Sequence, residues 1–238
     1  MTALIVGAGD GLGGAIARRF AREGHRVCVV RRTADKLAPL CAEIAAAGGR
    51  ATAFGVDARK EDDVIGLFDA VERDHGPIEV CVHNIGANVW FPIRETTVRV
   101  YTKVWEMACL SGFLVGREAA RRMVPRGRGT ILFTGATASL RGRAQFAAFA
   151  SAKHGLRALA QSMARELGPE GIHVAHVVVD GPIDMPWIRE NFPDLVASRP
   201  ADGLLRPDDI ADAYLTLHRQ PRSAWTFELD LRPWVEPW

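Results

Sequence analysis

The stretch Leu4-Ile5-Val6-Gly7-Ala8-Gly9-Asp10-Gly11-Leu12-Gly13 joins a short apolar run to a helix-like pattern through four glycines. The run Ala3–Val6 has the length and the β-branched character of a buried strand, and apolar residues then recur at helical spacing over Leu12–Glu23. A glycine-rich turn between a strand and a helix indicates the first half of a βαβ unit. The rest of the chain repeats this strand-to-helix alternation.

The glycines of this turn have distinct predicted tasks. Gly7 allows the tight turn, Gly11 lets the backbone approach a pyrophosphate, and Gly13 permits close packing of the helix on the strand. The helix that follows directs unpaired backbone N–H groups at the turn, which favours a bound phosphate there. The turn therefore predicts a phosphate-binding loop, and a tight turn without a ligand is the alternative.

Short apolar runs alternate with segments of helical period along the whole chain. Strands are predicted at Ala3–Val6, Arg26–Val30, Ala51–Val56, Ile78–Val82, Thr130–Phe133, His173–Val179 and Trp225–Leu231. Helices are predicted at Leu12–Glu23, Ala34–Ala47, Lys60–Asp74, Trp105–Val124, Phe149–Leu167 and Pro207–His218. The nearly continuous apolar character of the runs is typical of a parallel sheet with both faces covered. We therefore predict an α/β fold, a single-domain doubly wound Rossmann fold over residues 1–238 with a parallel seven-stranded sheet.

Residues 180–206 interrupt the alternation. They contain Pro182, Pro186, Pro193 and Pro200 and are predicted to be irregular. A segment of this length is too long for a plain connector, and such loops usually carry function or are disordered.

Composition and charge exclude several classes of protein. The 238 residues carry 30 basic and 28 acidic side chains, interspersed along the chain, for a formal net charge of +2. This balance predicts no nucleic-acid partner and no anionic membrane partner. No apolar stretch approaches the length of about 18 residues that spans a bilayer, and the start of the chain lacks the pattern of a signal peptide. The four cysteines have no metal-ligand spacing, which predicts reduced thiols, no metal site and a cytoplasmic location.

Several motifs resemble the short-chain dehydrogenase/reductase (SDR) family. The glycines have the spacing GxxxGxG, His83-Asn84-Ile85-Gly86 is similar to the family's Asn-Asn-Ala-Gly segment, and Asp57 matches the acidic residue beside the adenine amino group. The resemblance extends to Leu229-Asp230, with Val6 where the family usually has threonine. It implies an NAD(P)(H)-binding oxidoreductase. The residues that it assigns to the cofactor are Gly7, Gly9, Asp10, Gly11, Leu12, Gly13, Arg31, Arg32, Asp57, Ala58, Asn84, Ile85, Gly86, Lys153, Gly181 and Ile183.

Two arginines at the end of the second strand bear on which cofactor binds. A family member that prefers NAD carries an acidic residue at the position of Arg31, whereas the guanidinium groups of Arg31 and Arg32 suit a 2′-phosphate. Asp10 is an unfavourable neighbour for a phosphate. In the alternative arrangement both arginines are solvated and Arg31 pairs with Asp10. We predict that NADP(H) is favoured over NAD(H).

The catalytic motif that the resemblance implies is incomplete. Family members carry YxxxK, in which the tyrosine transfers the proton and the lysine lowers its pKa and holds the nicotinamide ribose. Here the segment is Phe149-Ala150-Ser151-Ala152-Lys153. Aligned by spacing, the family's serine falls on Ala136 and its asparagine on Cys109, so three of the four catalytic positions are substituted. The chain thus resembles an atypical subgroup with Phe in place of the active-site Tyr. Lys153 keeps its expected role on the ribose, and an exposed helix lysine is the alternative.

Two side chains near the motif are candidates for the missing acid. Ser139 shares a loop with Ala136, although an aliphatic hydroxyl is a poor acid unaided. Asp184, like Asp180, flanks a segment that resembles the family's Pro-Gly turn facing the nicotinamide, and a carboxyl group there with a raised pKa is a candidate. Turn capping is the commoner task of an aspartate beside glycine and proline.

Four aromatic residues are candidates for an apolar substrate pocket. They are Trp90, Phe146, Phe149 and Trp187. Trp187 lies in the 180–206 segment, which corresponds to the loop that covers the substrate in the family. For the two phenylalanines, plain core packing is the alternative.

Two functions are consistent with these residues. The first is an NADP(H)-dependent oxidoreductase of unusual mechanism or very weak carbonyl/alcohol activity, acting on an unknown small-molecule substrate. A polarised carbon–carbon or carbon–nitrogen double bond, protonated by water, is one such substrate. The second is a non-catalytic dinucleotide-binding sensor, scaffold or partner subunit.

A homodimer or homotetramer is predicted in either case. The family commonly assembles through the helices near Trp105–Val124 and Phe149–Leu167. The tail Leu231–Trp238 ends in two tryptophans, Trp234 and Trp238, that a monomer does not readily bury.

Overall fold

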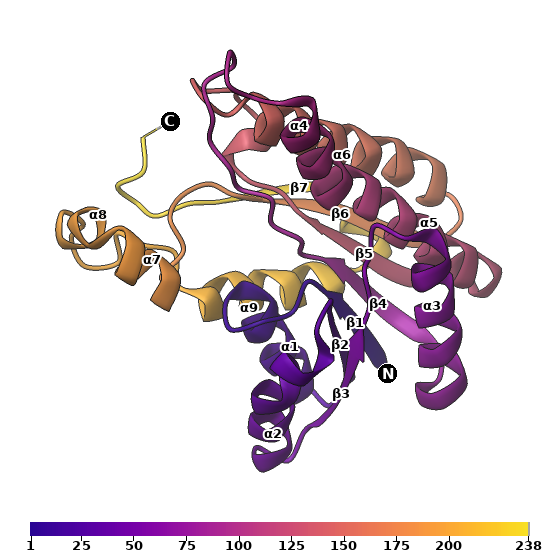
Figure 1. Ribbon diagram of the computed structural model, residues 1–238. Helices are drawn as coiled ribbons and strands as arrows, with labels where there is room; N and C mark the ends of the chain where they lie inside the picture. The colour runs from indigo at the N-terminus through magenta and orange to yellow at the C-terminus, as the bar shows by residue number, and fades with distance from the viewer. Residues whose placement is uncertain (238) are drawn as a thin grey trace.

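Seven parallel strands form one sheet in the order β3-β2-β1-β4-β5-β6-β7 in the computed structural model, which describes residues 1–237 (Figure 1). The strands are β1 (Thr2–Val6), β2 (Arg26–Arg31), β3 (Arg50–Gly55), β4 (Ile78–His83), β5 (Gly129–Thr134), β6 (Ile172–Val179) and β7 (Glu228–Leu231). The strand order reverses between β1 and β4. The predicted single-domain, doubly wound α/β fold is confirmed, and its strand order predicts a ligand crevice at that reversal.

The register places the ends of three central strands level with one another. Val6 pairs with Val30 on one side and with His83 on the other. All five residues of β1 and all eight of β6 are buried, as expected for strands covered on both faces. The segments that follow β1, β2 and β4 therefore leave the sheet at one common edge.

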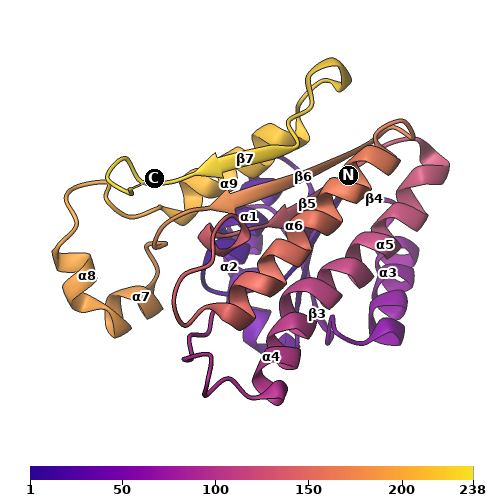
Figure 2. The ribbon, with the colours of Figure 1, turned by 90° about the horizontal axis from the view of Figure 1, so that it is seen from above.

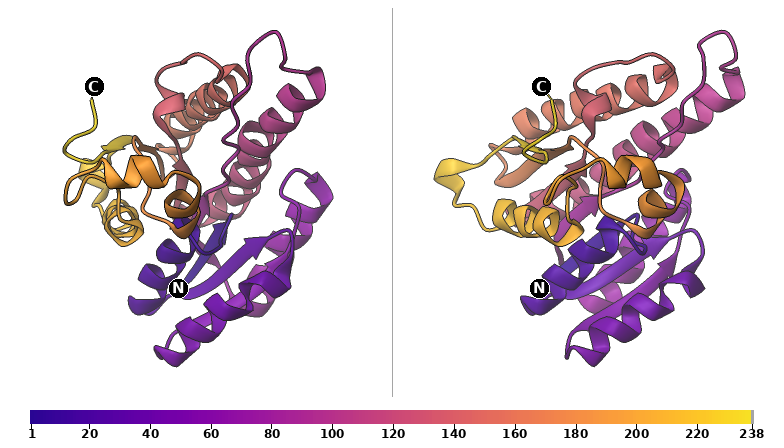
Figure 3. Two further views of the ribbon diagram at one scale, coloured as in Figure 1. Left: turned by 60° about the vertical axis from the view of Figure 1, so that its left-hand side comes forward. Right: turned by 90° about the vertical axis from the view of Figure 1, so that its left-hand side faces the viewer.

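Helices cover both faces of the sheet, and two short helices stand apart from these layers (Figures 1 to 3). One face carries α1 (Leu12–Arg22), α2 (Ala38–Ala46) and α9 (Pro207–His218). The other carries α3 (Glu61–His75), α4 (Val98–Trp105), α5 (Ser111–Met123) and α6 (Ala147–Leu167). The two that stand apart are α7 (Pro186–Asn191) and α8 (Pro193–Ala197). Phe20 and Tyr214 are fully buried in the first core, and Phe68 and Met123 in the second.

Some predicted boundaries are wrong for identifiable reasons. The helix predicted from Trp105 begins at Val98, because the side chain of Thr97 accepts a hydrogen bond from the backbone N–H of Val100 and caps it. A π turn over Glu106–Leu110 then connects α4 to α5. The predicted helix Ala34–Ala47 is a 3₁₀ turn followed by α2.

Two further differences concern the carboxyl-terminal third. The last strand begins at Glu228 rather than Trp225, whose ring stacks on His173 at a centroid distance of 5.0 Å. Residues 180–206, predicted to be irregular, contain α7 and α8. Both helices begin with a proline, which is favourable in a first turn.

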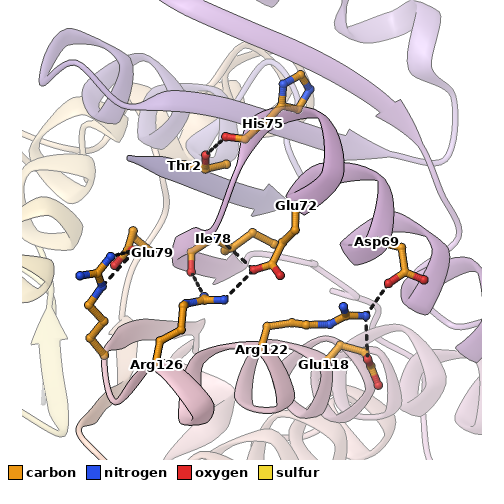
Figure 4. Close-up of polar contacts among 10 residues, drawn as sticks. Thr2, Asp69, Glu72, His75, Ile78, Glu79, Glu118, Arg122 and Arg126 are labelled. Carbon is orange, nitrogen blue, oxygen red and sulfur yellow. Dashed lines mark hydrogen bonds and ion pairs between the residues drawn. The ribbon is translucent and has the colours of Figure 1, made fainter.

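Ion pairs fasten α3 to α5 and to the 3₁₀ turn Val124–Arg126 that follows α5, away from the strand ends that form the crevice (Figure 4). Arg122 contacts Asp69 at 2.6 Å, and Arg126 contacts Glu72 at 2.9 Å while donating to the carbonyl oxygen of Ile78 at 2.7 Å. These partly exposed pairs contribute modestly to stability. They hold the helix layer against the start of β4.

No helix within residues 1–237 combines the length and apolar character needed to cross a membrane. The four cysteines are free thiols.

The residues that suggested an oligomer are exposed. The Trp234 side chain is 73% exposed and donates to the carbonyl oxygen of Ala201, whereas Trp238 lies outside the described residues. Val98 and Tyr101 leave α4 with exposed apolar side chains, and the homo-oligomer stays a prediction.

Candidate functional site

The glycine-rich turn is held tightly by the strands beside it. The backbone N–H groups of Gly7 and Ala8 both donate to the carbonyl oxygen of Val30 at 3.0 Å, and the side-chain amide of Asn84 donates to the carbonyl oxygen of Gly7 at 3.1 Å. Gly7 has φ +94°, and a Cβ atom there would overlap with the backbone carbonyl of Asn84. Only glycine fits this position without strain.

The start of α1 is packed just as closely. A Cβ on Gly13 would overlap with the carbonyl oxygen of Gly7, and one on Gly14 with that of Gly9. The sequence prediction included Gly13 and missed Gly14, although the GlyGly pair marked it. Gly11 caps the helix without a side-chain hydrogen bond, and the thioether of Met185 lies against it. The α1 N-terminus thus presents backbone N–H groups toward the turn, as an anion site requires.

A cavity of about 460 Å³ opens beside this turn, where β1, β2 and β4 end. Of the residues assigned to a cofactor, it brings together Gly7, Ala58, Arg31, Arg32, Asp57, Asn84, Ile85 and Gly86. Residues that the sequence reasoning missed are Val6, Ala8, Val30, Thr33, Lys36, Val56, Arg59 and Met107. The volume suits a ligand of nucleotide size.

Gly9, Asp10, Gly11, Leu12 and Gly13 do not line this cavity; they form the adjoining turn and the start of α1. Gly181 and Ile183 lie farther along, after β6. Gly181 has φ +149° and packs on Pro233, and Ile183 forms an isolated bridge with Leu205.

The cavity is electrostatically positive. Within the described part of the chain, Arg31, Arg32, Lys36 and Arg59 line it against one carboxylate, Asp57. Arg59 donates to both oxygens of Asp57, at 2.8 and 2.5 Å, and these bonds lower the pKa of Asp57 to about 2. The alternative in which Arg31 pairs with Asp10 is wrong within residues 1–237: the Arg31 guanidinium instead reaches the carbonyl oxygen of Lys36 at 3.5 Å. Three positive charges therefore remain uncompensated by the lining.

Lys153 points inward from α6 and is 2% exposed. Its Nζ donates to the carbonyl oxygens of Thr134 at 2.8 Å and of Ile85 at 3.3 Å. Burial lowers the pKa of Lys153 to about 8. The alternative of an exposed helix lysine is wrong. Because an ammonium group has three N–H donors, one is left for a ligand beside Ile85, a residue of the cavity wall.

The three substituted catalytic positions carry side chains that are poor proton donors. Phe149 lies one turn before Lys153 on α6, is 7% exposed, and packs on Phe146 with ring centroids 6.2 Å apart. Ala136 follows β5 and is partly exposed. Cys109 lies in the π turn, where burial raises the pKa of its thiol.

The candidate replacement acids are engaged as hydrogen-bond acceptors. Ser139 is fully buried and its Oγ accepts from the backbone N–H of Ala136 at 3.1 Å. Asp180 is fully buried and accepts from the Thr137 hydroxyl at 2.5 Å. Asp184 accepts two bonds from Arg189, at 2.6 and 2.7 Å. These contacts favour structural roles for all three side chains.

The four aromatic candidates divide into two groups. Phe146 and Phe149 pack with Val89 and Ala136 around the start of α6, so core packing accounts for much of their surface. Trp90 and Trp187 are 44% and 49% exposed, and the ring of Phe192, which the sequence reasoning missed, contacts both. The contact joins residues about 100 positions apart, which no local pattern indicates.

Comparisons with known proteins agree over most of the chain. The family model described as short chain dehydrogenase matches residues 1–194. An L-rhamnose 1-dehydrogenase (NAD(P)(+)) of Azotobacter vinelandii is 34% identical over 221 residues, covering 88% of this chain and 86% of that protein. A short-chain dehydrogenase from Rhodopseudomonas palustris has a structure with TM-score 0.85 and 54% identity, covering 98% of each chain. The structure of a metagenomic short-chain oxidoreductase in complex with NADP has TM-score 0.83 and 28% identity, covering 98% of this chain and 96% of that chain.

Proposed function

The chain belongs to the short-chain dehydrogenase family, and from that premise we propose that it is an oxidoreductase that binds NADP(H) in preference to NAD(H). The observation that carries the proposal is the cavity beside the glycine turn, with four basic side chains against a single ion-paired carboxylate. The glycine turn supports a dinucleotide site because Gly7 and Gly13 let the turn, Asn84 and the start of α1 pack closely, which brings the helix N-terminus to the turn. A relative of known structure contains NADP.

The residues that would hold the cofactor lie along one edge of the sheet. The backbone at Gly11 and the start of α1 suit the pyrophosphate, Asp57 and Ala58 suit the adenine end, and Lys153 offers one N–H to a ribose hydroxyl. When bound, the nicotinamide supplies or accepts a hydride. The protein's own contribution is to position this group against the substrate.

The basic side chains around the adenine end support a preference for a 2′-phosphate. Arg32 and Lys36 are exposed at the cavity rim, and Arg31 is half-buried beside them. Planar guanidinium groups bind phosphate through paired N–H donors. A carboxylate at this position would accept from ribose hydroxyls instead, and the cavity's one carboxylate is already bound by Arg59.

Arg32→Ala should weaken NADPH binding by about ten- to a hundredfold, because a charge-assisted contact to phosphate contributes about 1.5–3 kcal/mol. NADH affinity should change little. Calorimetric titration of both cofactors measures this, with Arg50→Ala as the control, since Arg50 is exposed at the opposite end of β3. An equal loss for NADPH and NADH would contradict the assignment of Arg32.

NADPH affinity should also fall as the pH rises above about 8, the pKa to which burial lowers Lys153. The neutral amine has only two N–H donors, and the carbonyl oxygens of Thr134 and Ile85 take both. The dissociation constant should rise by up to about tenfold per pH unit. Lys153→Met should bind more weakly at pH 7 and show a flat profile from pH 7 to 10. A wild-type profile as flat as that of the variant would overturn this role.

We further propose that the absence of a phenol at Phe149 makes ordinary carbonyl reduction slow. A substrate whose double bond is polarised by its own substituents accepts the hydride on carbon, and water supplies the balancing proton. The second candidate function, a non-catalytic NADP(H) sensor or partner subunit, is favoured by the same substitution. Turnover of an imine by the wild-type protein separates the two.

A further inference from the structure

Three aromatic rings bridge two loops at the carboxyl edge of the sheet. Phe192 contacts Trp90 with ring centroids 6.1 Å apart at 60°, and Trp187 with centroids 5.5 Å apart at 65°. Trp90 belongs to the segment after β4, whereas Trp187 and Phe192 lie in and directly after α7. We call Trp90, Trp187 and Phe192 the aromatic bridge.

The contacts on either side place this bridge over the candidate site. Met185, the residue before α7, lies against Gly11 of the glycine turn. On the other side, the backbone N–H of Phe91 donates to the carbonyl oxygen of Gln145 at 2.8 Å, which joins the Trp90 segment to the start of α6. The bridge therefore spans the space between the glycine turn and the helix that carries Phe149.

The side chains around Phe149 are mostly apolar. Val89, Ala136, Phe146 and Phe149 belong to one packed cluster, and the Arg143 guanidinium lies over the Phe146 ring, 5.1 Å from its centroid. In the bridging loop, Asp184 accepts two hydrogen bonds from Arg189. A polyhydroxylated substrate needs many fixed donors and acceptors, and this cluster supplies few of them.

The two tryptophans keep nearly half of their surface exposed although each contacts Phe192. Large apolar rings left open at a site gain free energy when a ligand covers them, and edge-to-face contacts favour a flat partner. We propose that the aromatic bridge binds a substrate with an aromatic ring and discriminates against sugars and polyhydroxy acids. This inference rests on the proposed function and adds its substrate class.

The test measures binding and does not depend on turnover. The NADPH-saturated protein, labelled with ¹⁵N-tryptophan, is titrated with α-tetralone, a bicyclic aryl ketone, and separately with L-rhamnose. The indole signals of residues 90 and 187 are assigned with Trp90→Phe and Trp187→Phe. The ketone should shift both signals and leave that of Trp225 unchanged, because Trp225 stacks on His173 at the other end of β6. L-rhamnose should shift none of them.

Trp90→Ala and Trp187→Ala should each weaken α-tetralone binding at least tenfold and leave NADPH affinity within twofold of wild type. The matched control is Trp234→Ala, whose side chain is exposed on the carboxyl-terminal tail outside the bridge. If NADPH binds but α-tetralone shifts neither indole, or L-rhamnose shifts both with similar affinity, the substrate class is wrong and the proposed function stands. If NADPH itself does not bind, the proposed function fails and this inference with it.

Discussion

Reduction of simple carbonyl compounds should rise by about 10²–10⁴-fold in kcat/KM when Phe149→Tyr and Ala136→Ser are combined, because a positioned general acid contributes about that factor. Phe149 lies one helical turn before the buried Lys153, so a phenol there would share a face of α6 with an ammonium group that stabilises its ionised form. Ala136 is partly exposed at the end of β5, which leaves a new serine hydroxyl free to face a substrate oxygen.

The measurement is NADPH oxidation with a panel of aldehydes and ketones, using the single variants and the pair. Phe146→Tyr is the matched control: it adds the same phenol at the residue before α6, seven residues from Lys153 instead of four, so its hydroxyl lies about one helical turn farther from the ammonium group. The gain in kcat/KM of the double variant should exceed the product of the gains of the two single variants, because the effects of groups that act as one unit are not additive. If the wild type already reduces these carbonyls rapidly and Phe149→Tyr adds nothing, another group supplies the proton.

Lowering the pH from 7 to 5 should remove about 4 kcal/mol of folding free energy through two buried histidines. Burial lowers the pKa of His83 to about 3, with the Lys153 charge adding to it, and that of His176 to about 4. Below pH 6.5 the unfolded chain binds protons that the folded protein rejects until the pH reaches those values. Each histidine therefore costs about 2 kcal/mol at pH 5, against a total stability of about 5–15 kcal/mol.

The urea midpoint at pH 7 and at pH 5 measures this loss. The folding free energy lost between pH 7 and pH 5 should be about 2 kcal/mol smaller in His83→Asn than in the wild type. This variant lacks the ring that bonds to the Ser111 hydroxyl at 2.7 Å. The control is His154→Gln, a histidine substitution at an exposed position on α6. An identical pH dependence of stability in wild type and His83→Asn would show that protonation of the His83 ring does not cause the loss. His25, His173 and His218 also have lowered pKa values and act in the same direction.

The elements that periodicity could predict are those whose local pattern and tertiary environment agree. β1 and α1 flank a glycine turn whose geometry only glycine permits, so sequence and structure coincide there within one or two residues. The start of α4 was missed because a single hydrogen bond, which the Thr97 side chain accepts from the backbone N–H of Val100, sets it. No residue spacing in the sequence reveals the π turn over Glu106–Leu110 that follows.

Some residues of the candidate site could likewise be placed from the sequence, and others could not. Motif residues such as Asn84 could be placed because they follow a strand directly, and the amide of Asn84 indeed holds the glycine turn. Lys36 and Arg59 reach the same cavity from separate loops, so their shared role needs the fold. The burial of Lys153 and the meeting of Trp90 with Phe192 likewise depend on packing between distant segments.

The most direct test of this account is a calorimetric titration of the purified wild-type protein with NADPH at pH 7. We expect one saturable site per chain, and an affinity at least tenfold higher than that for NADH. Absence of binding up to millimolar NADPH would contradict the central claim, that the chain retains a dinucleotide site beside a lysine whose usual phenol is missing.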